Sequence, residues 1–325
     1  MDFDRIVIRA TNWVGDAVMS LPALEAVRRR FPKAHIAVVA KPWVAGLYAG
    51  EHFADEVILY GGGSRWQLVR NLRAGHFDCA ILLQNAFDAA LVAWLAGIPN
   101  RIGYNRDGRG LLLTRAVPAP KLGEIPRHQR FYYLELLRRA GIIEGLPECE
   151  AIRLHAPAAA ARRRVIGVSP GAAYGTAKRW LPERFAEAAS ALAEQRGASI
   201  ALFGSSTERA LCSEVAALLN GHSVINYAGE TSLRQFIELA SGCELFLTND
   251  SGAMHIASAL GVPTVAIFGA TDDVATGPTG PQARVVRQAV ECSPCLLREC
   301  PIDHRCMTRV SSERVVEEAM KLLVD

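Results

Sequence analysis

The feature that most constrains the fold of this chain is a regular alternation of short, β-branched apolar runs with longer segments rich in Ala, Leu, Arg and Glu. This alternation is typical of parallel sheets whose two faces are covered by helices. In the first half of the chain it predicts strands at Arg5–Arg9, His35–Ala40, Glu56–Tyr60 and Cys79–Gln84, and helices around Leu21–Arg30 and Ala86–Ala96.

The alternation restarts after an Ala- and Arg-rich stretch, Ala158–Arg164. Because 325 residues exceed what one hydrophobic core usually supports, we predict two α/β domains, residues 1–160 and 161–325. Both are expected to be Rossmann-like, with the carboxyl ends of their parallel strands facing an interdomain cleft. The final helix, Ser312–Leu323, is a candidate to pack back on the first domain. Strands are predicted in the second half at Val165–Ser169, Ser199–Phe203, Glu244–Thr248 and Thr264–Phe268.

Charge and hydropathy exclude some function classes. The net charge is only +3, which gives no reason to expect a nucleic-acid partner. No run approaches the roughly 18–20 apolar residues of a membrane span, and the N-terminus enters a strand directly, without a signal peptide. We therefore expect a cytoplasmic protein whose association with a membrane is peripheral.

Basic residues are concentrated between Asn100 and Arg130, where seven Lys or Arg accompany only two acids. Either this is a solvated loop region, or it is a docking surface whose clustered positive field concentrates an anionic partner. The residues alone leave both interpretations open.

The first segment that could carry chemistry is Asn12-Trp13-Val14-Gly15-Asp16, between a strand and a helix. Glycine allows a tight turn and the close approach of a ligand, and a carboxylate there could accept a proton from an attacking hydroxyl. The alternative is that Asp16 only caps the helix. A helix N-terminus would also stabilise the ionised carboxylate, so Asp16 would be a weak base that takes the proton late in the reaction.

The second segment, Ser169-Pro170-Gly171 followed by Lys178-Arg179-Trp180, lies between the first strand of the second half and its helix. Small residues there let backbone N–H groups approach phosphate oxygens, and Lys178 adds a point charge. The segment has neither the Gly-x-Gly-x-x-Gly dinucleotide fingerprint nor the Walker sequence. It indicates a phosphate site of another kind.

The third segment, Thr248–His255, is a polar cluster at the end of a predicted strand. Ser251 and Gly252 would offer backbone N–H groups to a diphosphate at a helix N-terminus, and Asp250 could accept hydrogen bonds from sugar hydroxyls. The alternative is a helix-capping region in which His255 packs against the sheet. The density of polar residues favours a ligand site.

In this order and separation, the three segments resemble the family nine glycosyltransferases, the lipopolysaccharide heptosyltransferases. The likeness covers roughly residues 5 to 320, and Asn12–Asp16 with Val18-Met19-Ser20 is similar to the heptosyltransferase II form. Arg101-Ile102-Gly103-Tyr104 and His128 resemble further family segments. The resemblance implies a GT-B fold and an inverting, metal-independent transfer of heptose from ADP-heptose to a lipid A-linked lipopolysaccharide core, at the cytoplasmic face of the inner membrane.

Carried over residue by residue, the resemblance makes Asp16 the general base. It assigns donor binding to Ser169, Gly171, Lys178, Glu230, Asp250, Ser251, Gly252 and His255. It assigns acceptor binding, together with the basic segment, to Asn12, Trp13, Arg101, Arg106, Arg109 and His128. Two alternatives stay open: a transferase that uses another nucleotide-sugar or a protein acceptor, and a non-catalytic sugar-nucleotide-binding protein.

The resemblance implies that catalysis needs no cofactor. The string Asp2-Phe3-Asp4 imitates the Asp-x-Asp signature of metal-dependent sugar transfer in other folds. It precedes the first strand, at the end opposite the expected cleft, and we interpret it as a coincidence.

A cysteine cluster remains that this chemistry does not explain. Its spacing is C-x2-C-x4-C-x5-C, at Cys292, Cys295, Cys300 and Cys306, with His304 nearby. Four thiols so close in sequence suit a structural zinc or iron–sulfur site, and the alternative is a reduced cysteine-rich loop. The other cysteines are scattered and are expected to be small core residues, namely Cys79, Cys149, Cys212 and Cys243.

Overall fold

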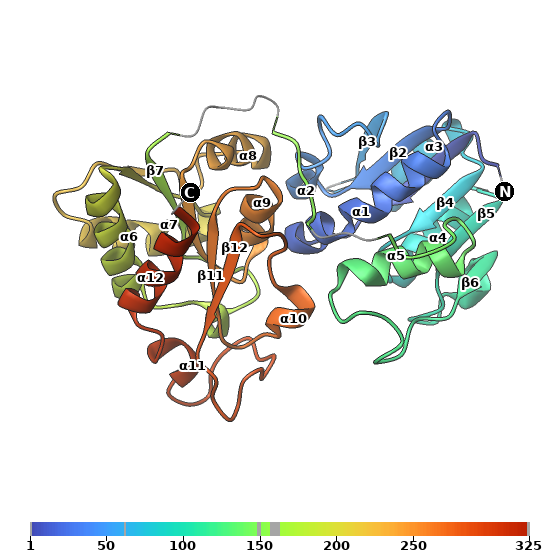
Figure 1. Ribbon diagram of the computed structural model, residues 1–325. Coiled ribbons are helices and arrows are strands. Elements are labelled where there is room, and N and C mark those ends of the chain that lie inside the picture. Colours follow the sequence, from blue (N-terminus) through green and yellow to red (C-terminus); the bar gives the residue numbers. More distant parts are fainter. Residues whose placement is uncertain (1, 62, 148–150, 157–162, 324–325) are drawn as a thin grey trace. The chain divides into compact units, whose positions relative to one another are not determined.

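The computed structural model describes residues 2–61, 63–147, 151–156 and 163–323. Contacts between Cα atoms divide the chain into two compact units, Met1–Cys149 and Glu150–Asp325, which we call the first and second domain. The predicted boundary between residues 160 and 161 lies outside the described residues, as does Cys149. Figure 1 draws the first domain in blue to green and the second in yellow-green to red.

Strands and helices alternate through the first domain, as the sequence predicts. Its elements are β1 (Arg5–Arg9), α1 (Val14–Arg30), β2 (His35–Ala40), α2 (Pro42–Ala45), β3 (Glu56–Leu59), α3 (Arg65–Ala74), β4 (Cys79–Leu82), α4 (Phe87–Leu95), β5 (Asn100–Tyr104), the 3-10 helix η1 (Gly110–Leu112), β6 (Arg115–Val117) and α5 (Arg130–Arg139).

The six strands of the first sheet lie in the order β3-β2-β1-β4-β5-β6, and every pair is parallel. This is the doubly wound Rossmann order, in which the direction of winding reverses between β1 and β4. At that point Arg9 is in register with Leu82, so the loops that follow the two strands start side by side. Ligands of such sheets bind at this reversal, outside the carboxyl ends of the strands.

Helices cover both faces of the first sheet because its central strands are apolar on both sides. Val7 of β1 faces a core formed with Leu68 of α3 and Ala90 of α4, and Arg9 shares that face because side chains alternate along a strand. Right-handed crossovers place α1 on the opposite face, where it packs against α5.

The second domain repeats this topology. Its strand order, β12-β11-β10-β7-β8-β9, is again all parallel and reverses between β7 and β10. Its elements are β7 (Val165–Ser169), η2 (Thr176–Lys178), α6 (Pro182–Arg196), β8 (Ser199–Leu202), η3 (Ser206–Glu208), α7 (Arg209–Leu218), β9 (Val224–Asn226), α8 (Leu233–Ser241), β10 (Leu245–Asn249), α9 (Gly252–Ala259), β11 (Thr264–Phe268), α10 (Asp273–Thr276), β12 (Ala283–Arg287), α11 (Arg305–Thr308) and α12 (Ser312–Leu323).

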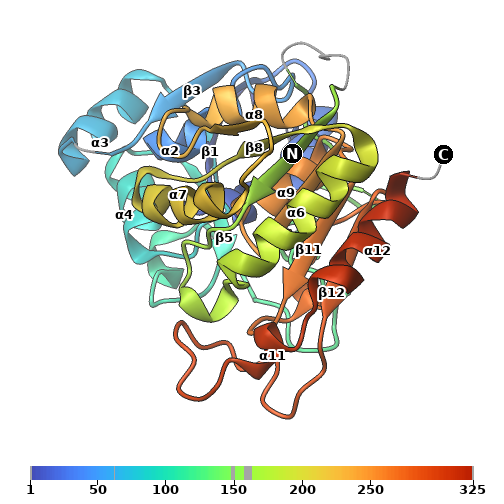
Figure 2. The same ribbon diagram turned by 90° about the vertical axis from the view of Figure 1, so that its left-hand side faces the viewer.

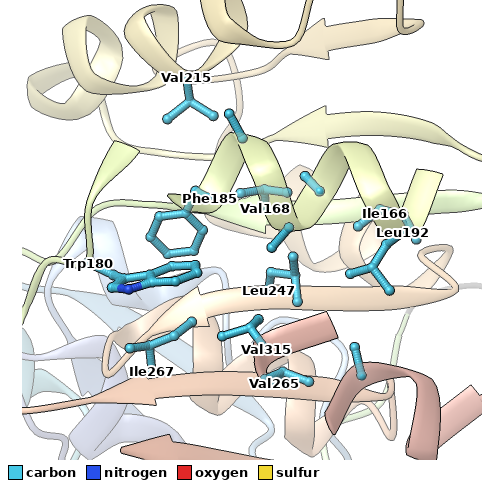
Figure 3. Packing of buried hydrophobic residues seen from close by; sticks show 14 of the residues in the cluster. Ile166, Val168, Trp180, Phe185, Leu192, Val215, Leu247, Val265, Ile267 and Val315 are labelled. Carbon is cyan, nitrogen blue, oxygen red and sulfur yellow. The ribbon is translucent and has the colours of Figure 1, made fainter. Parts of the chain in front are cut away.

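The core of the second domain lies between its sheet and helices α6, α7 and α12. Figure 3 shows Trp180 and Phe185 among the strand residues Val168 and Leu247, all of them fully buried. The indole N–H of Trp180 donates to Val310 O at 3.1 Å, which satisfies the one polar atom of this buried side chain. Helix α12 contacts α6, β11 and β12 of its own domain, and Figure 2 shows α6 and α12 side by side.

The predicted parallel α/β fold is confirmed, and all eight predicted strands are present. β1, β2, β7 and β11 have the predicted bounds, and the others differ by one or two residues. The first helix begins at Val14 rather than near Leu21, which brings Asp16 into its first turn. Within the described residues, no helix is both long and apolar enough to cross a membrane.

Candidate active site

The second and third predicted segments meet at the reversal of the second sheet. Ser169 at the end of β7 is in register with Thr248 of β10. Asn249 then ties the two loops together, because its side-chain amide donates to Pro170 O at 2.7 Å and its side-chain oxygen accepts from Trp180 N at 2.9 Å. The strand pairing and both hydrogen bonds are buried. They therefore fix the shape of the loop that carries Lys178.

Lys178 and Asp250 form a buried ion pair at this site. The lysine Nζ lies 2.5 Å from Asp250 Oδ2, and the two side chains expose only 13% and 4% of their surface. Thr271, just after β11, donates its hydroxyl to the same carboxylate oxygen at 2.5 Å. Since a buried charge is costly unless it is paired, the carboxylate holds the ammonium group at the carboxyl ends of β7 and β10.

Helix α9 begins beside this ion pair and presents backbone N–H groups. Ser251 is its N-cap and makes no side-chain cap hydrogen bond, while Gly252 is its first residue. Both residues are half-buried. His255 is buried, 5% exposed, within the first turn. The orphan N–H groups of a helix start attract anions, so a lysine and a helix N-terminus adjoin here, as a diphosphate site requires.

Three other predicted donor residues have different surroundings. Ser169 is buried at the end of β7. Gly171 is also buried, and a Cβ on it would lie 2.1 Å from Glu208 Oε1, so a larger residue there would displace the Glu208 carboxylate. Glu230 is exposed on the loop before α8 and pairs with Arg209.

The cysteine cluster lies in residues 292–306, and this loop forms hydrogen bonds with the segment that contains Lys178. Ala177 is held at both main-chain atoms: its N–H donates to Arg298 O at 2.9 Å, and its carbonyl accepts from His304 Nε2 at 3.0 Å. The hydroxyl of Tyr174 donates to Leu296 O at 2.8 Å. A Cβ on Gly175 would lie 2.2 Å from Arg298 O, so the two segments are in close contact. We call residues 292–306 the cysteine loop.

The four sulfur atoms of the cysteine loop approach one another without converging on one point. Burial and the nearby thiols Cys292, Cys295 and Cys300 raise the pKa of Cys306. In this fully described part of the chain, no three metal-ligand atoms lie within 4.8 Å of one another. A single tetrahedral zinc ion, with bonds of about 2.3 Å, needs sulfurs closer than that, so the metal prediction stays a prediction.

In the first domain, Asp16 is the third residue of α1 and is half-buried. The N-cap is Trp13, which makes no side-chain cap bond, so Asp16 does not occupy the capping position. Asp16 Oδ1 accepts a hydrogen bond of 3.0 Å from the hydroxyl of Tyr133, on α5. Burial, then the charge of Asp16, raises the pKa of Tyr133 well above its usual value, so the phenol remains a donor.

The predicted acceptor residues Arg101 and Arg109 are engaged with the backbone. Arg109 is fully buried and donates to the carbonyls of Tyr104 and Gln84, and burial lowers its pKa to about 10. Arg101 donates to Leu112 O at 2.6 Å and to the carbonyl of Ile98. These contacts give both arginines a structural role in the β5–β6 region and leave Arg109 no surface for a ligand.

The remaining acceptor candidates are accessible. Arg106 is exposed in the turn after β5, and Trp13 is 56% exposed. Asn12 accepts, through its carbonyl, the indole N–H of Trp43 at 2.9 Å. His128 is half-buried just before α5, where its Nδ1 accepts from Arg130 N at 3.2 Å. Their role in acceptor binding stays a prediction.

Sequence reasoning missed three residues that build the site. Asn249, Thr271 and Tyr133 contact the predicted residues through bonds that join distant parts of the chain. Asn249 lies within the predicted segment Thr248–His255, so its position in the sequence could have identified it. Nothing local marks Thr271 or Tyr133.

Each domain therefore has Rossmann topology and a polar cluster where its strand order reverses. Two all-parallel Rossmann-like domains in one chain form a GT-B-like fold, which solved heptosyltransferase structures share. The model of the family described as glycosyltransferase family 9 (heptosyltransferase) matches residues 65–305. The chain belongs to this family.

Comparisons with individual proteins agree with this assignment. Lipopolysaccharide heptosyltransferase 2 of Escherichia coli K12 is 31% identical over 98% of this chain and 99% of its own. The solved structure of E. coli ADP-heptose LPS heptosyltransferase II superposes with a TM-score of 0.84, at 31% identity and 98% coverage of both chains. The E. coli heptosyltransferase WaaC with ADP-2-deoxy-2-fluoro heptose has the same fold, with a TM-score of 0.75 at 18% identity over 98% of this chain and 99% of that one.

Replacing Gly175 tests whether the cysteine loop positions Lys178. In Gly175→Ala the new methyl group would collide with a backbone carbonyl, which cannot move alone, so the two segments must separate. We expect ADP to bind about tenfold more weakly in isothermal titration calorimetry, a loss of about 1.4 kcal/mol. The control is Thr176→Ala, at an exposed position of the same segment. Unchanged ADP affinity in a folded Gly175→Ala protein would contradict this role.

Proposed function

We propose that this protein transfers heptose from ADP-heptose to the inner core of lipopolysaccharide, as a heptosyltransferase II. The observation that carries the proposal is the buried Lys178–Asp250 pair beside the start of α9, which suits a nucleoside diphosphate leaving group. Relatives support the substrates: those that are 30–31% identical over nearly the whole chain are named lipopolysaccharide or lipooligosaccharide heptosyltransferase 2.

On the donor side, the diphosphate of ADP-heptose binds against the N–H groups at Ser251 and Gly252 and against the ammonium of Lys178. Asp250 changes partner in this step: it shares Lys178 with the incoming phosphates, and its second oxygen accepts a sugar hydroxyl. Ser169, Gly171 and His255 shape the pocket, and Glu230 faces the nucleoside. Charge that develops on the departing ADP is stabilised by groups already in position.

On the acceptor side, Asp16 acts as general base. Its carboxylate takes the proton of an acceptor hydroxyl while that oxygen forms a bond to the anomeric carbon and the bond from this carbon to the phosphate oxygen breaks. ADP leaves with the electron pair. A single displacement from the face opposite ADP inverts the anomeric configuration, as in one-step glycosidases. Asn12, Trp13, Arg106 and His128 contact the acceptor.

Lysine and backbone donors supply the positive charge in this mechanism, so we propose that transfer needs no metal ion. Asp2 and Asp4 flank the amino end of β1 rather than the carboxyl end where the ligand-binding loops start. The acceptor is a lipid-anchored glycan, and we propose that the protein works as a peripheral protein at the cytoplasmic face of the inner membrane.

The decisive experiment is mass spectrometry of the product made from ADP-heptose and lipid A-linked core acceptors of graded length. We expect a mass increase of one heptose with one of these acceptors. Asp16→Asn keeps the shape of the side chain and removes the base, so turnover should fall about 10²–10⁴-fold while ADP affinity is retained. A wild-type protein that binds ADP-heptose without transferring it would overturn the proposal, and full turnover by folded Asp16→Asn would remove Asp16 from the mechanism.

Tyr133→Phe should move the acidic limb of the pH profile of kcat/KM to higher pH. A hydrogen bond from a neutral phenol favours the ionised carboxylate. Without it, Asp16 holds its proton up to a higher pH, and the base becomes available later as the pH rises. Tyr132→Phe is the matched control, because that hydroxyl contacts Asn85 instead. An identical profile in wild type and Tyr133→Phe would show that the Tyr133 hydroxyl does not tune the base.

For the cysteine loop we propose a structural role outside catalysis, as a zinc or iron–sulfur site. A structural zinc site would show about one equivalent of zinc per chain. An iron–sulfur cluster, which holds its cysteines farther apart, would show iron, acid-labile sulfide and visible absorption in protein purified anaerobically. Sub-stoichiometric metal of every kind would rule out an obligate site and leave a reduced loop.

A further inference from the structure

The carboxyl edge of the first sheet carries two cations that the proposed transfer chemistry does not use. Arg9 ends β1, and its guanidinium carbon lies 3.9 Å from the centre of the Tyr60 ring. Lys41 follows β2, and its Nζ lies 4.2 Å from the centre of the same ring. Tyr60, just after β3, therefore contacts both cations through the face of its ring. The three residues lie at the carboxyl ends of the neighbouring strands β1, β2 and β3.

Arg9 is buried without an ion-pair partner. Its residue surface is 6% exposed, and its Nη1 has no hydrogen-bond partner in the described part of the chain. Burial lowers its pKa, as expected for a cation that is incompletely compensated. A buried, unpaired donor on a charged group costs stability, so its retention needs an explanation other than folding.

The one carboxylate close to this pair is already engaged. Asp88, in the first turn of α4, accepts from Arg65 Nε at 2.6 Å and from the Tyr60 hydroxyl at 3.0 Å. Across the described residues, neither Arg9 nor Lys41 lies within salt-bridge distance of a carboxylate. Asp88 thus pairs with Arg65, and the positive charges of Arg9 and Lys41 have no ion-pair partner among the described residues.

Exposed aromatic side chains flank the two cations. Trp43, two residues after Lys41, is 58% exposed, and the Lys41 ammonium lies 5.5 Å from its ring. Its indole N–H is anchored to Asn12, next to the exposed Trp13. The faces of such rings are suited to the CH groups of sugars. Two indoles and two cations together match an anionic saccharide better than a free ion.

We infer that Arg9, Lys41 and Tyr60 form a subsite for a phosphate or carboxylate group on the acceptor saccharide. The inference rests on the proposed function, because it takes the acceptor to be a charged glycan. Because Arg9 Nη1 is buried in the unliganded structure, it would meet an oxygen of that anion only after the side chain moves toward solvent, and the bound anion would neutralise the cluster. Guanidinium and ammonium groups are the side chains that bind such oxyanions most strongly.

The subsite binds a part of the acceptor remote from the attacked hydroxyl. Arg9 lies on the α3 and α4 face of the sheet, whereas Asp16 lies on α1, which covers the opposite face. Both stand at the same edge, where Trp13 precedes α1 and Trp43 lies in α2, just after β2. The anion therefore belongs to a neighbouring sugar or to a distal substituent, and its contacts select the acceptor rather than assist the chemistry.

The test is steady-state kinetics of Arg9→Met and Lys41→Met with ADP-heptose and a phosphorylated, lipid A-linked core acceptor. We expect each variant to raise the acceptor KM about tenfold and to leave kcat and the KM for ADP-heptose nearly unchanged. Arg70→Met, at an exposed arginine of α3, is the control with the same change in charge. Two modified acceptors identify the anion: one is treated with phosphatase, and the other has its carboxyl groups reduced to alcohols. With the acceptor that has lost the recognised group, the acceptor KM of the wild type should rise to that of the variants.

Two further measurements separate the outcomes. Titration of the acceptor without donor, followed by tryptophan fluorescence, reports binding even if no transfer occurs, so failure of the proposed function leaves the subsite testable. A melting temperature that is equal or higher in Arg9→Met would match a residue retained for ligand binding at a cost in stability. Unchanged acceptor KM and acceptor affinity in both variants would overturn the inference, and Lys41→Met, at a half-buried position, decides it if Arg9→Met does not fold.

Discussion

The polar cluster of the second domain depends on one buried ion pair. Lys178 lies in a single 3-10 turn rather than in a longer helix or a strand. Its ammonium group is held by Asp250, at the end of the central strand β10. Around this pair the Asn249 amide, the Thr271 hydroxyl and the start of α9 all converge. Because the pair is nearly excluded from water, the field that it presents to an incoming anion is strong and already oriented.

The central strands could be predicted from sequence because they are apolar on both faces, and a sheet buried on both faces leaves that imprint on composition. β6 and β9, each of three residues, and β12 are partly exposed, so no apolar run marks them. β5 contains Arg101 and Gly103 and was interpreted as part of a basic segment and of a family motif rather than as a strand, and its arginine folds back onto local carbonyls.

The site shows the same division. Asp250 and Ser251 were predicted because they stand directly after a strand, and Lys178 because it lies in the connection that follows the neighbouring strand β7. Arg109 was expected to bind the acceptor, yet it lies in the interior and donates to backbone carbonyls of the β4–α4 loop and of Tyr104 at the end of β5. A positive charge in a sequence does not indicate whether its donors face a ligand or the chain itself, and only the tertiary contacts distinguish Arg109 from Arg9.

The contacts between the cysteine loop and the lysine segment have a consequence for sequence tolerance. Ala177 is held through its main-chain N–H and carbonyl, and both Arg298 and Leu296 contribute main-chain carbonyls. Two of these bonds need the side chains of Tyr174 and His304, whereas the other side chains of the two segments can change without moving Lys178, provided that a glycine remains at position 175. The position of Lys178 thus depends on the path of two backbones and on the side chains of Tyr174 and His304, and related chains could vary in sequence at the other positions of these segments.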